Sequence, residues 1–170
     1  MTGGVDAADR PDVIDVRRAG EHDAVELAEL RWACRAEGGE IDSGVDRATF
    51  VEVCARFLRR EMAAGRQANW IAVHGGRIVA HIGVHIVPML PRPCRPDDAF
   101  GVVTTNYTIP ELRGRGIATR LLNRAVAWAE DEDLELLIVW PSERAVSLYR
   151  RAGFTGDHDI LQRTLRPYAP

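Results

Sequence analysis

Residues Phe100 to Glu130 read FGVVTTNYTIPELRGRGIATRLLNRAVAWAE and carry the strongest structural signal in the sequence. The first ten residues are β-rich and stop at Pro110, which has no N–H to donate to a sheet. From Gly116 onward the apolar residues recur at helical spacing. The stretch therefore predicts a strand and a helix joined by a glycine- and arginine-rich turn.

The flanking segments extend this unit in both directions. Upstream, the patterns predict a strand at Val13–Val16 and two helices, at Glu21–Ala36 and Phe50–Met62. A hairpin follows, whose strands Trp70–His74 and Arg77–Val84 are joined by a Gly75-Gly76 turn. Downstream, they predict a strand buried on both faces, a helix capped by Gly153 and one or two closing strands, over Leu134–Trp140, Ser142–Ala152 and Phe154–Leu165. The order β-α-α-β-β-β-α-β-α-β, with an optional last strand, predicts an α/β fold with a mixed sheet.

Length and composition predict one domain. The chain has 170 residues, of which 1–11 resemble a flexible leader, and residues 12–170 can form a single core. A formal charge of −3 is too small to indicate a nucleic-acid or membrane surface, and no apolar run approaches the ~20 residues of a membrane span. The three cysteines are widely spaced, which favours a cytoplasmic protein without disulfides.

The turn Leu112–Arg120, LRGRGIATR, suits an anion. A helix start leaves backbone N–H groups unpaired and carries a partial positive charge, and Gly114 and Gly116 would let a phosphate reach those amides. The alternative is a tight turn with solvated arginines. A P-loop is excluded because no Gly-Lys-Ser/Thr follows, and a Rossmann fingerprint is weakened because Thr119 stands where its third glycine belongs.

Other sites receive less support from the sequence. His81 and His85 are four residues apart on a predicted strand, about 13 Å at ~3.3 Å per residue, which is too far for one metal ion. There is no Gly-x-Ser-x-Gly or His-Glu-x-x-His motif. We therefore expect no metal.

Two motifs in order resemble the GCN5-related N-acetyltransferase (GNAT) family. Arg113, Gly116 and Ala118 match the family's Arg/Gln-x-x-Gly-x-Gly/Ala signature for acyl-CoA. About thirty residues later, Leu148-Tyr149 and Gly153-Phe154 match its later helix, which carries Leu-Tyr and ends in Gly-Phe. The resemblance implies a mostly antiparallel mixed sheet of six or seven strands flanked by about four helices.

The resemblance also implies a set of acetyl-CoA contacts. The backbone at the end of the fourth strand would pair with the pantetheine arm, the turn amides would hold the pyrophosphate, and Tyr149 would lie beside the thioester sulfur. Ser142 stands where many members have asparagine, and it also suits a helix N-cap. The residues so implied are Asn106, Tyr107, Thr108, Arg113, Gly114, Arg115, Gly116, Ile117, Ala118, Thr119, Ser142 and Tyr149.

The implied activity is N-acetylation of an amine on a small molecule or peptide. Tyr149 would protonate the departing thiolate, but the fourth strand holds no acid to serve as general base and Glu135 lies at the start of the fifth strand. Water or an acid from a loop would then be needed. A non-catalytic acyl-CoA-binding module, or a site for another phosphate ligand such as a nucleotide, is the alternative.

Acids in two loops are candidates for attracting a cationic acceptor. Glu37, Glu40 and Asp42 lie between the first two helices, and Asp97 with Asp98 precedes the fourth strand. A solvated acidic loop is the simpler interpretation of the first group. The family also makes a homodimer an open expectation.

Overall fold

The computed structural model describes residues 13–41 and 44–156, and the predicted leader, 1–11, lies outside them. The described residues run through five strands, four helices and three short 3-10 turns. Their bounds are β1 Asp15–Arg18, η2 Glu21–Asp23, α1 Ala24–Glu37, α2 Arg47–Ala63, β2 Gln67–His74, β3 Arg77–Pro88, β4 Ala99–Thr108, η3 Pro110–Leu112, α3 Ile117–Asp131, β5 Leu137–Val139, η4 Glu143–Ala145 and α4 Val146–Arg151.

The strands form one sheet in the order β1-β2-β3-β4-β5. The first four are antiparallel neighbours, and β5 runs parallel to β4 after the crossover through α3. This arrangement confirms the mixed, mostly antiparallel α/β class. Five strands rather than six or seven occur in the described part of the chain, because most of the predicted closing segment lies in residues 157–170, outside it.

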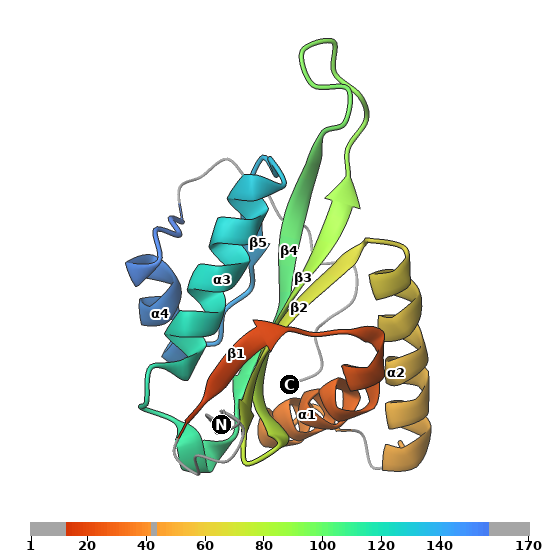
Figure 1. The fold of residues 1–170 in the computed structure, drawn as a ribbon, viewed down its shortest axis with the longest axis vertical. Helices are drawn as coiled ribbons and strands as arrows, with labels where there is room; N and C mark the ends of the chain where they lie inside the picture. The colour runs from red at the N-terminus through yellow and green to blue at the C-terminus, as the bar shows by residue number, and fades with distance from the viewer. Residues whose placement is uncertain (1–12, 42–43, 157–170) are drawn as a thin grey trace, which may run out of the picture.

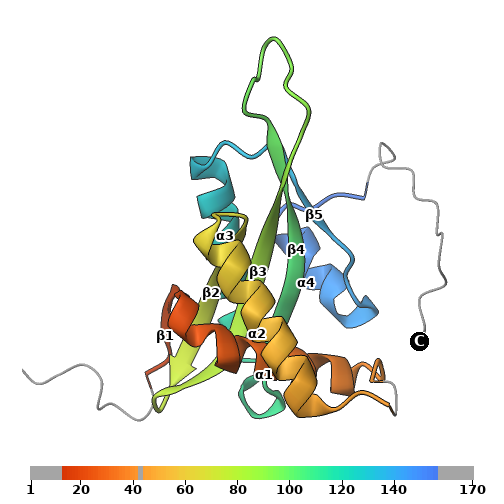
Figure 2. The same ribbon diagram turned by 90° about the vertical axis from the view of Figure 1, so that its right-hand side faces the viewer.

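Helices cover both faces of the sheet, with α3 and α4 on one side and α1 and α2 on the other (Figures 1 and 2). Successive strand residues point to opposite faces, so the sheet has two cores. Trp70 and Ala72 pack with the α3 residues Leu121 and Leu122, whereas Ile71 packs against α1 and α2. None of the helices described here combines the length and apolarity that crossing a membrane requires.

The structure corrects the prediction for β5. The predicted strand Leu134–Trp140 is reduced to three residues, and these are half-buried rather than enclosed on both faces. Trp140, just after the strand, is 64% exposed. The physical reason is that β5 pairs only with β4 in the part of the chain described here, so an apolar run alone does not establish burial.

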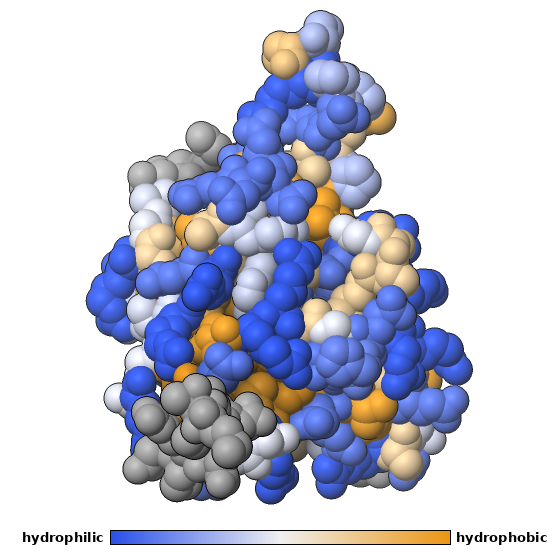
Figure 3. All heavy atoms as spheres, viewed as in Figure 1, coloured by the Kyte–Doolittle hydropathy of each residue, from blue (hydrophilic) through white to orange (hydrophobic). Residues whose placement is uncertain are grey.

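The predicted hairpin between β2 and β3 is confirmed. Gly75 and Gly76 have φ angles of 55° and 74°, the left-handed conformation that a two-residue hairpin turn requires at both positions. The proline-rich segment after β3 forms an arm that projects from the body and mixes hydrophilic and apolar side chains (Figures 1 and 3). Leu90 on this arm is 88% exposed.

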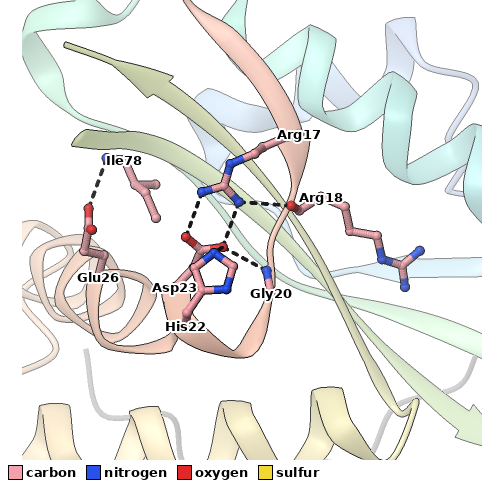
Figure 4. Close-up of polar contacts among 7 residues, drawn as sticks. All are labelled: Arg17, Arg18, Gly20, His22, Asp23, Glu26 and Ile78. Atoms are coloured by element: carbon pink, nitrogen blue, oxygen red, sulfur yellow. Dashed lines mark hydrogen bonds and ion pairs between the residues drawn. The ribbon is translucent and has the colours of Figure 1, made fainter. Parts of the chain in front are cut away.

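A buried carboxylate organises the junction between β1 and α1 (Figure 4). Asp23 is 5% exposed and accepts two hydrogen bonds from the Arg17 guanidinium, both 2.8 Å, and one from the Gly20 N–H, also 2.8 Å. The hydrogen bond from Arg17 is the main reason that the pKa of Asp23 lies below its usual value. Next to it, Glu26 accepts a hydrogen bond from the Ile78 N–H at the start of β3.

We expect Asp23→Ala to lower the free energy of unfolding by about 2 kcal/mol at pH 7, since it removes a charge-assisted pair and leaves a backbone N–H without its acceptor. Because the folded-state pKa is depressed, this stability is present above the unfolded pKa of about 3.9 and is lost as pH falls through the folded pKa. Urea unfolding between pH 7 and pH 2 measures the difference. The exposed pair member Glu52 provides the control, because Glu52→Ala should cost below about 0.5 kcal/mol; equal costs for the two variants would contradict the assignment.

Candidate active site

The sheet opens between β4 and β5. These strands pair only from Gly101 to Val103 on β4, against Leu137 to Val139 on β5. β4 continues to Thr108, so its last five residues have no strand beside them on that side among the residues described (Figure 2). The Thr104 and Thr108 carbonyls of this segment accept hydrogen bonds from Arg31 and Arg113, and the other backbone groups on the edge have no strand to pair with among the residues described.

A β-bulge marks the point where the opening starts. Gly83 of β3 pairs with Thr105 and Val84 pairs with Val103, which leaves Thr104 as an extra residue on β4. Bulges bend and twist the strand that carries them, and they recur beside active sites. The bulge thus turns β4 away from β5.

The predicted anion turn follows directly after this open strand. Gly114 and Gly116 have φ angles of 77° and 72°, and Gly116 is the N-cap of α3. A Cβ at either glycine would meet no atom within 4 Å, so the space above the turn is open. The first N–H groups of α3 point out of the helix end, as expected for an anion cradle.

The turn borders a cleft of about 480 Å³ between β4, α3 and α4. It brings together nine of the twelve residues expected to contact acetyl-CoA, which are Asn106, Tyr107, Thr108, Arg113, Gly114, Gly116, Ile117, Ala118 and Thr119. Further lining residues were not predicted from the sequence, namely Leu112, Arg144, Ala145, Ser147, Leu148 and Arg151. The last five come from η4 and α4, and the exposed face of the Leu-Tyr helix is the sequence signal that could have identified them.

One polar atom beside this cleft is buried without a partner. The hydroxyl of Thr108 lacks a hydrogen bond within the described residues, whereas the Asn106 side chain lies close enough to the Tyr149 phenol to lower its pKa. Buried polar groups are normally satisfied, so unpaired ones call for a ligand or water. With the open strand and the helix amides, the Thr108 hydroxyl suits a long ligand that is amide-rich at one end and anionic at the other, as coenzyme A is.

Tyr149 lies on α4 next to Asn106 of the open strand, and it is not among the residues that line this cleft. It is 5% exposed, packs edge-on against Phe154 with ring centroids 5.3 Å apart, and lines a second hollow beside β5. Burial raises the pKa of its phenol, and the nearby Asn106 offsets part of the rise. The phenol is therefore protonated at neutral pH and lies near the open strand.

Arg113 turns from the glycine turn toward α1. Its guanidinium donates two hydrogen bonds to the Glu37 carboxylate, at 2.8 and 2.5 Å, and its Cζ lies 5.5 Å from the centroid of the Tyr107 ring. Arg144 donates to the same carboxylate at 2.6 Å. One acid at the end of α1 thus bridges two arginines that line the cleft, whereas Arg115 is exposed and does not line it.

Glu37 and Glu40, two of the three acids predicted between the first two helices, form ion pairs with arginines. Hydrogen bonds from Arg113 and then Arg144 lower the pKa of Glu37 to about 2, so it is ionised at neutral pH and a poor general base. Glu40 pairs with Arg35 at 2.5 Å. Asp42 lies outside the described residues.

Ser142, Glu135 and Asp98 lie outside the cleft. Ser142 is the N-cap residue of η4, but its side chain makes no capping hydrogen bond and it does not line the cleft. Glu135 and Asp98 both contact Arg92 near the start of β4, at the opposite end of the strand from Asn106–Thr108. The Glu135 N–H bonds the Ala99 carbonyl, seven residues from Asn106, or roughly 23 Å along a strand.

His81 is another titratable group on the sheet face that carries Tyr107, its partner in register. It is fully buried, and burial, with a smaller effect from Arg31, lowers its pKa to about 3. Among the described residues around the open strand, none of the groups with a resolved pKa shift is poised near 7. The described groups with a resolved shift therefore include no general base matched to neutral pH.

Comparisons with known proteins agree with this geometry. The family model described as "Acetyltransferase (GNAT) family" matches residues 25–154. No curated protein sequence matches the chain. Solved structures share its fold over about nine-tenths of the chain. A predicted acetyltransferase with acetyl-CoA from Clostridium acetobutylicum is 24% identical with a TM-score of 0.76, covering 90% of this chain and 97% of its own.

Two further structures show the same fold at comparable coverage. A GCN5-related N-acetyltransferase from Ralstonia eutropha JMP134 is 24% identical with a TM-score of 0.69, over 89% of this chain and 99% of its own. A ribosomal-protein-alanine N-acetyltransferase from Brucella melitensis biovar Abortus 2308 is 18% identical with a TM-score of 0.63, over 91% and 99%. At these identities the structures establish the fold alone.

Proposed function

Because the chain belongs to the GNAT family of acetyltransferases, we propose that it transfers an acetyl group from acetyl-CoA to a primary amine of a small molecule or protein. The observation that carries this proposal is the continuity of the open β4 edge with the glycine turn at the start of α3. Together they offer an amide-pairing surface and an anion cradle along one cleft, in the order in which coenzyme A presents its amides and phosphates.

The chain's own residues have separable roles in this proposal. The N–H groups at the start of α3 hold the pyrophosphate, and the backbone of Asn106–Thr108 pairs with the pantetheine arm. Backbone N–H groups on the open edge polarise the thioester carbonyl. As the amine nitrogen bonds to the carbonyl carbon and the C–S bond breaks, Tyr149 gives its proton to the sulfur. The amine loses a proton to solvent, and solvent returns a proton to the Tyr149 phenolate.

The acceptor amine must lose a proton before it can attack, and the site needs no strong base if water removes that proton. A neutral amine is the nucleophile, and an amine with a pKa well above 7 is mostly protonated at neutral pH. We propose that water near the open edge takes this proton. The rate at subsaturating acceptor should then rise with pH until it levels near the pKa of the acceptor amine.

The acceptor itself is approached from the α1 side, where Glu37 and Glu40 lie. Both carboxylates are paired with arginines, Glu37 with Arg113 and Arg144 and Glu40 with Arg35, so we propose that they orient the acceptor side of the cleft and neither accept a proton nor supply a net negative field. The Brucella melitensis protein acts on a ribosomal-protein alanine, so a protein N-terminus belongs in any acceptor panel beside lysine, polyamines and aminoglycosides. We place the protein in the cytoplasm, where acetyl-CoA is available, and a homodimer stays a prediction.

The deciding experiment is an amine panel with acetyl-CoA, read as release of free thiol and as acetylated product by mass spectrometry. Amine-dependent, saturable release supports the proposed transfer. Calorimetric binding of acetyl-CoA without release for any amine would instead favour a non-catalytic acyl-CoA-binding module. Equal binding of a nucleotide lacking the pantetheine arm would indicate a different phosphate ligand.

A further inference from the structure

Arg31 reaches from α1 to the sheet at the point where β4 leaves β5. Its Nη1 donates to the Thr105 hydroxyl at 2.6 Å and to the Thr104 carbonyl at 3.3 Å. Thr104 is the extra residue of the bulge, and the β4–β5 pairing ends one residue earlier, at Val103. The arginine contact, the bulge and the opening of the sheet therefore coincide.

The surroundings of this contact make it strong. Thr105 is buried, and the space over Gly83 is filled by side-chain atoms of Asn69, Gln67 and Thr104, all within 2.7–2.8 Å of where a Cβ would stand. The groups around the bulge are thus polar and closely packed. A guanidinium donating to a hydroxyl and a carbonyl in such a setting makes charge-assisted hydrogen bonds that are roughly twice as strong as neutral ones.

A second arginine holds the other end of the same segment. The Nε of Arg113 donates to the Thr108 carbonyl at 2.9 Å, and its two Nη atoms donate to the carboxylate of Glu37 on α1. Residues 104–108 are therefore fixed at their start by Arg31 and at their end by Arg113. Helix α1 supplies the first contact directly and anchors the second.

We propose that Arg31 is a positioning residue for acyl transfer, holding the β4 bulge at Thr104–Thr105 so that the backbone N–H groups after it keep their direction toward the thioester carbonyl. The inference rests on the proposed acetyltransferase activity. Removal of one oxyanion donor costs about 100- to 1,000-fold in kcat, and a misplacement of ~1 Å can cost about 100-fold. Arg31 acts through the strand and touches no reacting atom.

Steady-state kinetics with acetyl-CoA and the amine found in the panel test the proposal. Arg31→Ala should lower kcat about 30-fold and weaken acetyl-CoA binding, measured by calorimetry, much less, because the strand that pairs with the pantetheine arm is loosened while the turn and α3, which hold the pyrophosphate, are untouched. Arg31→Lys keeps one donor and should recover part of kcat. Arg56, an exposed arginine on α2 paired with Glu52, gives the matched control, and Arg56→Ala should behave as wild type.

Amide hydrogen exchange in residues 104–108 gives a readout that needs no turnover. We expect exchange at least tenfold faster in Arg31→Ala than in the wild type or Arg56→Ala. Thr105→Val, which keeps the side-chain volume and removes the hydroxyl, should show the same change if Arg31→Ala fails to fold. If the wild type acetylates no amine, the proposed function fails, and exchange alone then decides whether Arg31 fixes the strand.

Two results would overturn the role of Arg31. One is a kcat for Arg31→Ala within twofold of wild type. The other is unchanged exchange across residues 104–108 in both Arg31→Ala and Thr105→Val. A loss of kcat accompanied by an equal loss of acetyl-CoA affinity would also count against it, since a general loosening of the cleft would then explain the defect.

Discussion

Tyr149→Phe is expected to lower kcat about 100-fold while the Kd for acetyl-CoA stays within about twofold. A positioned general acid contributes about 10²- to 10⁴-fold, and the substitution removes only the phenolic oxygen. Burial keeps that phenol protonated at neutral pH, so it is ready to donate. The ring still packs against Phe154, so the fold should be retained. Stopped-flow detection of free thiol gives kcat, and calorimetry gives Kd.

The control for Tyr149 separates the phenol from the packing of its ring. Phe154→Leu removes the edge-on partner of Tyr149 and leaves the hydroxyl, and we expect it to cost less than about fivefold in kcat. If Tyr149→Phe and Phe154→Leu are equally impaired, Tyr149 is a packing residue. Unchanged turnover in Tyr149→Phe would remove the phenol from the chemistry.

Gly116→Asp is expected to weaken acetyl-CoA binding by at least about 100-fold. The side chain would project into the open space over the turn, and its carboxylate would lie where the start of α3 favours a phosphate. The residue would also hold φ at 72°, which costs an L-residue about 1–2 kcal/mol. Gly116→Ala adds the strain without the charge, and a loss of only about tenfold is expected. Calorimetry with acetyl-CoA measures both.

Gly65 provides a matched control for backbone strain. Its φ is 70°, a Cβ there would also meet no atom within 4 Å, and it follows α2 on the other side of the sheet. Gly65→Asp should therefore lower the melting temperature about as much as Gly116→Asp and leave acetyl-CoA affinity unchanged. An unaltered Kd in Gly116→Asp would mean that the anion binds elsewhere on the protein.

Most of the fold, and many residues of the cleft beside the glycine turn, followed from local patterns. The strand, turn and helix over Phe100–Glu130 and the Gly75-Gly76 hairpin appear as predicted. Nine of the twelve expected acetyl-CoA residues line one cleft, although contact with the cofactor stays a prediction. These features are readable because the alternation of a strand, the periodicity of a helix and the φ of a glycine are properties of a few adjacent residues.

Other expectations failed or were incomplete where the answer depends on distant partners. Leu134–Trp140 is apolar, yet β5 is short and half-buried because burial depends on what packs against it. Glu37 was expected in an acidic loop, but α1 and the glycine turn bring it to arginines 76 and 107 residues away. The bulge at Thr104 has no glycine or proline to indicate it in the sequence.

The α/β class, the glycine turn before α3 and the helix that carries Tyr149 could be predicted from the sequence alone, because each depends on a short run of adjacent residues. Only the tertiary structure revealed the opening between β4 and β5, and Arg31 and Glu37 holding the two ends of that open strand. Those contacts join side chains from separate elements, and they exist only once the packing of α1 against the sheet has set the distances between them.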